Sequence, residues 1–157
     1  MEYYLKIGEI KIGTQDDILR TILGSCIGLC LWDKKKHIGG MVHIMLPTSP
    51  EKNHSENKGK YATTAVPTLL NAMLKHKSQK SDLVAKIFGG ASMFAKLESI
   101  NANNIGERNY SITYNLVKEL HIPIVAEDVK GTIGRSITLN CSTGIVLVKT
   151  SQGIIEK

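Results

Sequence analysis

ILGSCIGLCLWDKKKHIGGMVHIML, residues 22–46, carries the clearest structural pattern in the chain. Two apolar runs, 22–32 and 38–46, flank a polar segment at 33–37, and Pro47 ends the second run. Apolar runs of this length between turn residues are typical of strands that are buried on both faces. The stretch therefore predicts a β-hairpin with its turn at 33–37.

The segments on either side of this hairpin alternate between strand and helix patterns. Alternating apolar residues at 3–12, broken at Gly8, predict a bent strand or two short strands, and the polar segment 48–60 predicts a loop. Apolar residues at i, i+3 and i+4 predict amphipathic helices from Ala62 to Leu74 and from Ile105 to Leu120. Further strands are predicted at 83–88, 122–129, 136–141 and 145–149, the last two as a closing hairpin. This order predicts an α/β or α+β fold with mixed sheets and two long helices.

Length and composition indicate one globular domain over residues 1–157. The chain has 42% hydrophobic and 22% charged residues and a mean hydropathy of -0.06, which argues against wholesale disorder. No apolar run approaches the roughly 18 residues of a membrane span, and Met1–Tyr4 lacks the basic and apolar regions of a secretory signal. We therefore expect a cytoplasmic protein without membrane insertion.

The positive charge of the chain is concentrated in one segment. The net charge is +6, and residues 34–80 carry nine Lys against Glu51 and Glu56, which makes that segment +7 (nine minus two). A one-sided positive field favours an acidic partner, although a solvated lysine face is the simpler interpretation. The low aromatic content of 5% and the lack of interleaved Arg argue against nucleic acid.

Three cysteines, Cys26, Cys30 and Cys141, lack the paired spacing of a zinc ribbon or a redox C-x-x-C motif. We expect Cys30 and Cys141 to be inert core residues, and we expect no metal and no organic cofactor.

Cys26 and His43 are the candidate nucleophile and base. A free thiol with a pKa of about 8.5 is mostly protonated at pH 7, so it needs a base within reach. A two-residue turn at Lys34–Lys35 would set Cys26 opposite His43, with Cβ atoms about 4.5–5.5 Å apart. A three-residue turn would set Ile44 opposite Cys26 instead and turn His43 to the other face. A buried histidine that is merely part of the core is the alternative interpretation.

Five motifs follow one another along the chain: LGSC at 23–26, GGMVHIMLP at 39–47, KIFGGASM at 86–93, IGERN at 105–109 and DVKGTIGR at 128–135. With these motifs in this order, the chain resembles the CheD family of chemoreceptor glutamine deamidases over nearly its whole length. Lys130 stands where the family usually has the first of two glycines, so a positive φ there would strain the backbone.

The resemblance implies an α/β/β layered fold and hydrolysis of glutamine side-chain amides on chemotaxis receptors. Carried over residue by residue, it makes Cys26 the nucleophile, His43 the base and Thr21 the residue that orients His43. It also implies receptor cytoplasmic helices as substrate, a CheC-type phosphatase as partner, and methylesterase activity as a possible side reaction.

Further expectations concern electrostatics. We expect an adjacent imidazolium and N–H donors to lower the pKa of Cys26, and the amides near Ser25 and Cys26 to form an oxyanion hole. We also expect a basic face beside Cys26, with charge reversal at Lys58, Lys60 and Lys77 weakening substrate binding.

The rival functions are a non-catalytic regulatory module that binds a phosphatase or a receptor helix, and a basic nucleic-acid-binding domain.

Overall fold

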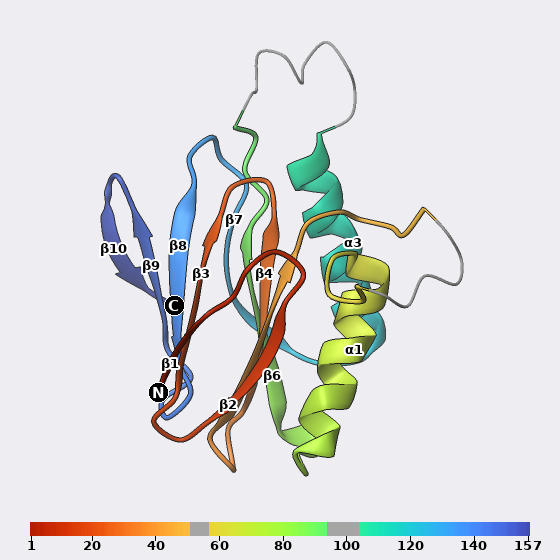
Figure 1. Cartoon of the computed structure of the whole chain (residues 1–157), viewed down its shortest axis with the longest axis vertical. Helices are drawn as coiled ribbons and strands as arrows, with labels where there is room; N and C mark the ends of the chain where they lie inside the picture. The colour runs from red at the N-terminus through yellow and green to blue at the C-terminus, as the bar shows by residue number, and fades with distance from the viewer. Residues whose placement is uncertain (51–56, 94–103) are drawn as a thin grey trace.

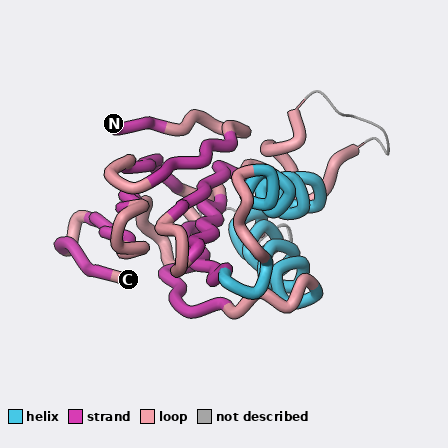
Figure 2. Tube along the Cα trace, turned by 90° about the horizontal axis from the view of Figure 1, so that it is seen from below, coloured by secondary structure: helices cyan, strands magenta, loops and turns pink. Residues whose placement is uncertain are grey.

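Two β-sheets stack face to face, and long helices cover the outer face of one of them (Figures 1 and 2). The computed structural model describes residues 1–50, 57–93 and 104–157. Its strands are β1 (Glu2–Tyr4), β2 (Ile10–Thr14), β3 (Ile18–Leu23), β4 (Ile27–Asp33), β5 (Ile38–Ile44), β6 (Leu83–Gly89), β7 (Ile124–Val129), β8 (Arg135–Asn140), β9 (Val146–Thr150) and β10 (Gly153–Glu156). Its helices are α1 (Ala62–Lys75), the short 3₁₀ helix η1 (Lys80–Asp82) and α3 (Ile105–Glu119).

Both sheets are mixed. The outer sheet has the order β1-β3-β8-β9-β10 and the central sheet has the order β2-β5-β4-β6-β7. Only β1–β3 and β6–β7 are parallel among the paired strands of the described residues. The predicted α+β architecture with layers of helix, sheet and sheet is therefore confirmed. The extent of the single domain stays a prediction.

The central sheet is buried on both faces, as the apolar runs predicted. One face of β4 and β5 presents Ile27, Leu29 and Val42 to helix α1. The other face presents Cys30 and Met41 to the outer sheet. Both strands therefore lie in the interior, and polar side chains on their inward faces need hydrogen-bond partners there.

The predicted single strand at 22–32 is wrong. The structure divides it into the end of β3, which pairs with β8 in the outer sheet, and β4, which pairs with β5 and β6 in the central sheet. The break falls at Gly24–Cys26, where backbone carbonyls accept hydrogen bonds from residues after β6 instead of from a neighbouring strand. Cys26 thus lies in a connection between the two sheets.

The β4–β5 hairpin is confirmed, but both predicted turns are wrong. Asp33 pairs with Ile38, so four residues form the turn, and His43 pairs with Gly28. The Asp33 carboxylate accepts the N–H groups of Lys35 and Lys36, each at 2.9 Å, and this stabilises the longer turn. Compared with the predicted register the pairing shifts by two residues, which keeps every side chain on its predicted face.

The remaining elements follow the predictions closely, with one strand missed. Both helices are confirmed, and Asn104 caps α3 by accepting the N–H of Glu107 at 3.1 Å. Residues 3–12 form two strands, whereas β10 was not expected. Lys130 has a φ of +69°, so the expected strain is present. No helix in the described ranges is long and apolar enough to span a membrane.

Candidate active site

His43 and Thr21 meet across the space between the two sheets. His43 is on β5 of the central sheet and Thr21 is on β3 of the outer sheet. The Oγ1 atom of Thr21 lies 2.7 Å from Nδ1 of His43 and 2.7 Å from the carbonyl oxygen of Leu5. Both side chains are buried, with exposed fractions of 1% for Thr21 and 4% for His43. Hydrogen bonds therefore hold the pair within the sandwich.

These contacts determine which nitrogen of His43 carries the proton. A threonine hydroxyl has one hydrogen, and Thr21 donates it to the Leu5 carbonyl. The Thr21 oxygen must then accept a hydrogen bond from Nδ1–H of His43. Nε2 is left with its lone pair, and it is buried without a hydrogen-bond partner among the described residues. Nε2 is thus the atom that can accept a proton.

Burial also keeps the imidazole neutral. It lowers the pKa of His43 below its ordinary value of 6.5, although the nearby Leu5 carbonyl opposes part of this effect. The ring is consequently uncharged at pH 7. An uncharged imidazole with a free Nε2 is suited to act as a general base.

The Cys26 segment is held by hydrogen bonds to three consecutive backbone carbonyls. The pairs are Gly24 with the N–H of Ala91 at 3.0 Å, Ser25 with Nδ2 of Asn109 at 3.0 Å, and Cys26 with the N–H of Gly90 at 2.9 Å. In a trans peptide the N–H points away from the carbonyl of the same plane. The amides of Ser25, Cys26 and Ile27 are therefore turned away from Gly90, Ala91 and Asn109.

Glycine is required where the chain passes closest to Cys26. Gly89 has a φ of +100°, and a Cβ there would lie 2.2 Å from the carbonyl oxygen of Cys26. No other residue fits this position without displacing the Cys26 segment. The glycine pair of the 86–93 motif thus has a packing role.

The pKa of the Cys26 thiol shifts in the opposite direction from the one expected. Cys26 is half-buried against the apolar cluster between the sheets. The contact between His43 and Thr21 spans the same space between the sheets. Burial raises the pKa of Cys26, so the expected lowering is wrong: the structure desolvates the thiol and provides a neutral imidazole. Cys30 and Cys141 are buried core residues as predicted, and burial raises the pKa of Cys141 to about 11.

The lysines do not form one face beside Cys26. Six of them are exposed at the opposite end of β4, around its turn with β5 (bottom of Figure 1): Lys34, Lys35, Lys36, Lys75, Lys77 and Lys80. The ammonium of Lys36 donates to the Lys77 carbonyl, which joins the turn to the end of α1. A seven-residue strand separates this end from Cys26 by about 23 Å. The expectation of a basic face beside Cys26 is wrong for these six lysines.

Lys58 and Lys60 lie at the Cys26 end of the central sheet. The N–H groups of Met45 and Leu46, just beyond β5, donate to the Lys60 carbonyl at 2.9 and 3.0 Å. Lys58 is exposed and Lys60 is half-buried. Lys52 lies outside the described residues.

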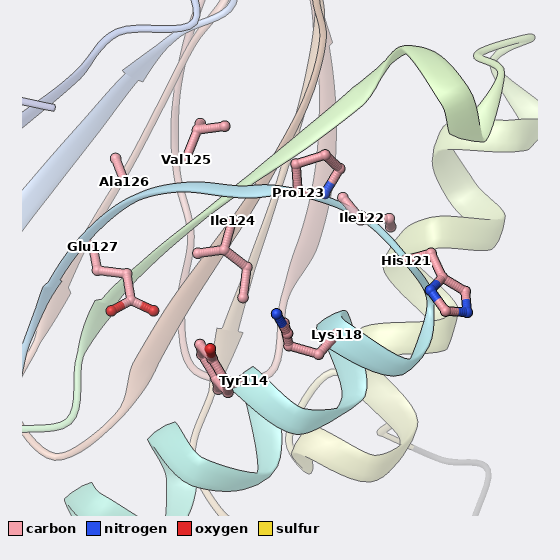
Figure 3. A pocket seen from close by; sticks show the side chains of 9 residues that line it. All are labelled: Tyr114, Lys118, His121, Ile122, Pro123, Ile124, Val125, Ala126 and Glu127. Carbon is pink, nitrogen blue, oxygen red and sulfur yellow. The ribbon is translucent and has the colours of Figure 1, made fainter.

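A groove of about 820 Å³ lies between the C-terminal part of α3 and β7 (Figure 3). Its lining includes Tyr114, Lys118, His121 and Glu127. Lys118 is nine residues beyond Asn109 on α3, about 14 Å along the helix axis. None of the three candidate residues, Thr21, Cys26 and His43, lines the groove.

Comparisons with known proteins place the chain in a family. Residues 45–150 match the family described as CheD chemotactic sensory transduction. A probable chemoreceptor glutamine deamidase CheD of Methanococcus maripaludis is 43% identical over 147 residues, 93% of each chain. The chain belongs to the CheD family. The match to the family model begins after His43, whereas the similarity to this CheD relative covers nearly the whole chain.

Two further CheD proteins show comparable similarity. A probable chemoreceptor glutamine deamidase CheD of Caldanaerobacter subterraneus is 42% identical, covering 93% of the chain and 92% of the relative. One of Clostridium botulinum strain Hall is also 42% identical, covering 95% and 93%. The resemblance to CheD seen in the sequence motifs is thereby confirmed.

Proposed function

We propose that this chain is a protein-glutamine amidohydrolase that converts glutamine side chains of chemotaxis receptors to glutamate, with Cys26 as nucleophile. The names of its CheD relatives support the reaction and the substrate. The observation that carries the assignment of residues is the Thr21–His43 contact, which leaves Nε2 of His43 free within the sandwich that Cys26 borders.

The first half of the reaction is acyl transfer to sulfur. Nε2 of His43 takes the thiol proton as Cys26 Sγ attacks the amide carbon of glutamine. Because burial raises the pKa of Cys26 and lowers the pKa of His43, we propose that proton transfer accompanies attack. His43 then gives the proton to the leaving nitrogen, the C–N bond breaks, and ammonia departs from a thioester.

The second half is hydrolysis of that thioester. His43 takes a proton from water, and the resulting hydroxide attacks the carbonyl carbon. The C–S bond then breaks, and His43 returns the proton to sulfur, which releases glutamate and the Cys26 thiol. The amides of Ser25 and Cys26 stabilise the oxyanion in both steps, because their planes are held by hydrogen bonds before substrate binds. A glutamyl methyl ester would react by the same route, so we propose methylesterase activity as a side reaction.

We propose that the protein acts in the cytoplasm. The deamidation itself is tested in vitro on the cytoplasmic helical fragment of a chemoreceptor. Incubation with the protein should convert specific glutamines to glutamates, detected by peptide mass spectrometry, and should release ammonia. The same receptor fragment incubated without the protein is the control for spontaneous deamidation.

A CheC-type phosphatase is the further partner that we propose. Absence of receptor conversion together with binding to such a phosphatase would support the regulatory-module alternative over the enzyme. Salt-sensitive binding to DNA without conversion would support the nucleic-acid alternative.

Replacing Thr21 by valine should lower kcat about 10- to 100-fold, by analogy with the loss of partners that orient metal-bound histidines. Valine keeps the shape but removes the oxygen that accepts from Nδ1–H of His43, so the proton can move to Nε2. The measurement is steady-state deamidation kinetics. Thr21→Ser is the matched control and should retain most of the activity. Equal kcat for the valine and serine variants would exclude this role for the hydroxyl.

Charge reversal should distinguish the two groups of lysines. At physiological ionic strength, Lys58→Glu with Lys60→Glu should lower kcat/KM about three- to tenfold, because these residues lie at the Cys26 end and steer an acidic substrate. Lys34→Glu with Lys75→Glu makes the same change in net charge at the opposite end. Screening over about 8 Å at physiological ionic strength should leave that second pair without effect. Equal effects of both pairs would contradict local steering.

A further inference from the structure

Asn109 connects the Cys26 segment to the end of the strand that carries His43. Its side chain is fully buried on α3, and Nδ2 donates to two carbonyl oxygens, those of Ser25 and Met45, each at 3.0 Å. Ser25 immediately precedes Cys26, and Met45 follows His43 by two residues. One amide group therefore bonds to both chain segments that carry the proposed nucleophile and base.

The first turn of α3 is packed so that this amide can reach both carbonyls. Gly106 contacts the backbone of Gly90 and Ala91, and a Cβ on it would lie 2.6 Å from each of their carbonyl oxygens. Gly90 and Ala91 in turn donate to the carbonyls of Cys26 and Gly24. Asn109 follows Gly106 by three residues, on the same side of the helix. The close approach at Gly106 thus brings Asn109 to the Cys26 segment.

The two donors are the part of Asn109 that the site uses. Its Oδ1 atom is buried and has no hydrogen-bond partner within the described ranges. Leaving a buried acceptor unpaired costs free energy, so a residue serving only to fill space here would be apolar. Instead, Nδ2 of the side chain donates to backbone carbonyls beside Cys26 and beyond His43.

We propose that Asn109 is a positioning residue for catalysis, holding the Cys26 segment and the end of β5 at the separation that proton transfer from Cys26 to His43 needs. This inference rests on the proposed function of Cys26 and His43. Displacement of reacting groups by about 1 Å can cost about 100-fold in rate. Loss of the two hydrogen bonds should therefore affect kcat and leave KM largely unchanged.

Asn109→Leu removes both donors while keeping a similar shape. We expect its kcat to fall about 10- to 100-fold with KM within about twofold of the wild type. Thr113→Val is the matched control, because Thr113 is equally buried on α3 and its hydroxyl has no partner among the described residues. The control should keep kcat within about twofold. Unchanged kcat in Asn109→Leu, or an equal loss in Thr113→Val, would overturn the proposal.

Alkylation of Cys26 by iodoacetamide gives a readout that needs no receptor substrate. Its rate, followed by peptide mass spectrometry, should fall in His43→Ala, and Asn109→Leu should react more slowly than the wild type, toward the rate of His43→Ala. Alkylation of Asn109→Leu at the wild-type rate would overturn the proposal. Lack of receptor conversion by the wild type would instead refute the proposed function.

Should Asn109→Leu fail to fold, the wild-type protein still tests the proposal by NMR. The side-chain amide protons of Asn109 should exchange slowly with deuterium and change chemical shift when Cys26 is alkylated. Fast exchange, or shifts that do not respond to alkylation, would overturn it.

Discussion

Cys26→Ala is expected to abolish receptor deamidation, lowering kcat/KM by at least about 1,000-fold. Without sulfur no thioester can form, and water activated by His43 would have to attack a stable amide directly. The measurement is conversion of glutamine to glutamate in the receptor fragment, followed by peptide mass spectrometry. Iodoacetamide should inactivate the wild type in proportion to the modification of Cys26.

Cys30→Ala is the matched control for loss of a thiol from the same region. Cys30 is fully buried in the cluster between the sheets, so its replacement should lower stability and leave kcat nearly unchanged. Receptor conversion by Cys26→Ala at the wild-type rate would exclude Cys26 as nucleophile.

His43→Gln should lower kcat about 100- to 10,000-fold, the contribution typical of a general base. Glutamine is polar and of similar size, but it cannot accept and return a proton. In the wild type, kcat/KM should be flat around pH 7 and fall only below the ordinary histidine pKa of 6.5, since burial lowers the pKa of His43. The residual activity of His43→Gln should lack this acidic decline.

The same pKa has a consequence for stability that can be measured separately. Because the pKa of His43 is lower in the folded than in the unfolded chain, the unfolded chain binds the proton first as pH falls through 6.5. The free energy of unfolding should therefore decrease with falling pH in that range, and less so in His43→Gln.

A kcat/KM profile whose acidic decline lies above pH 6.5, or persists in His43→Gln, would contradict the assignment of His43 as the base.

Sequence patterns alone predicted most of the helices and strands, and the family resemblance supplied the candidate site residues. The helical periodicity of 62–74 and 105–120 and the apolar runs around the Lys34–His37 turn report burial within one segment, and all correspond to elements of the structure. The family motifs drew attention to Cys26, His43 and Thr21. Each of these signals is local, since it can be evaluated without knowing which distant segment lies opposite.

Only the tertiary structure revealed how those residues are combined. The strand break at Gly24–Cys26 and the Thr21–His43 contact both depend on partners from other segments. Asn109 is 84 positions from Ser25 in the chain, and nothing in the helical pattern around it indicates which carbonyls it binds. Apolar spacing determines which face of an element is buried. Pairing of buried polar groups contributes to which faces meet, because most such groups find a partner wherever the fold brings one.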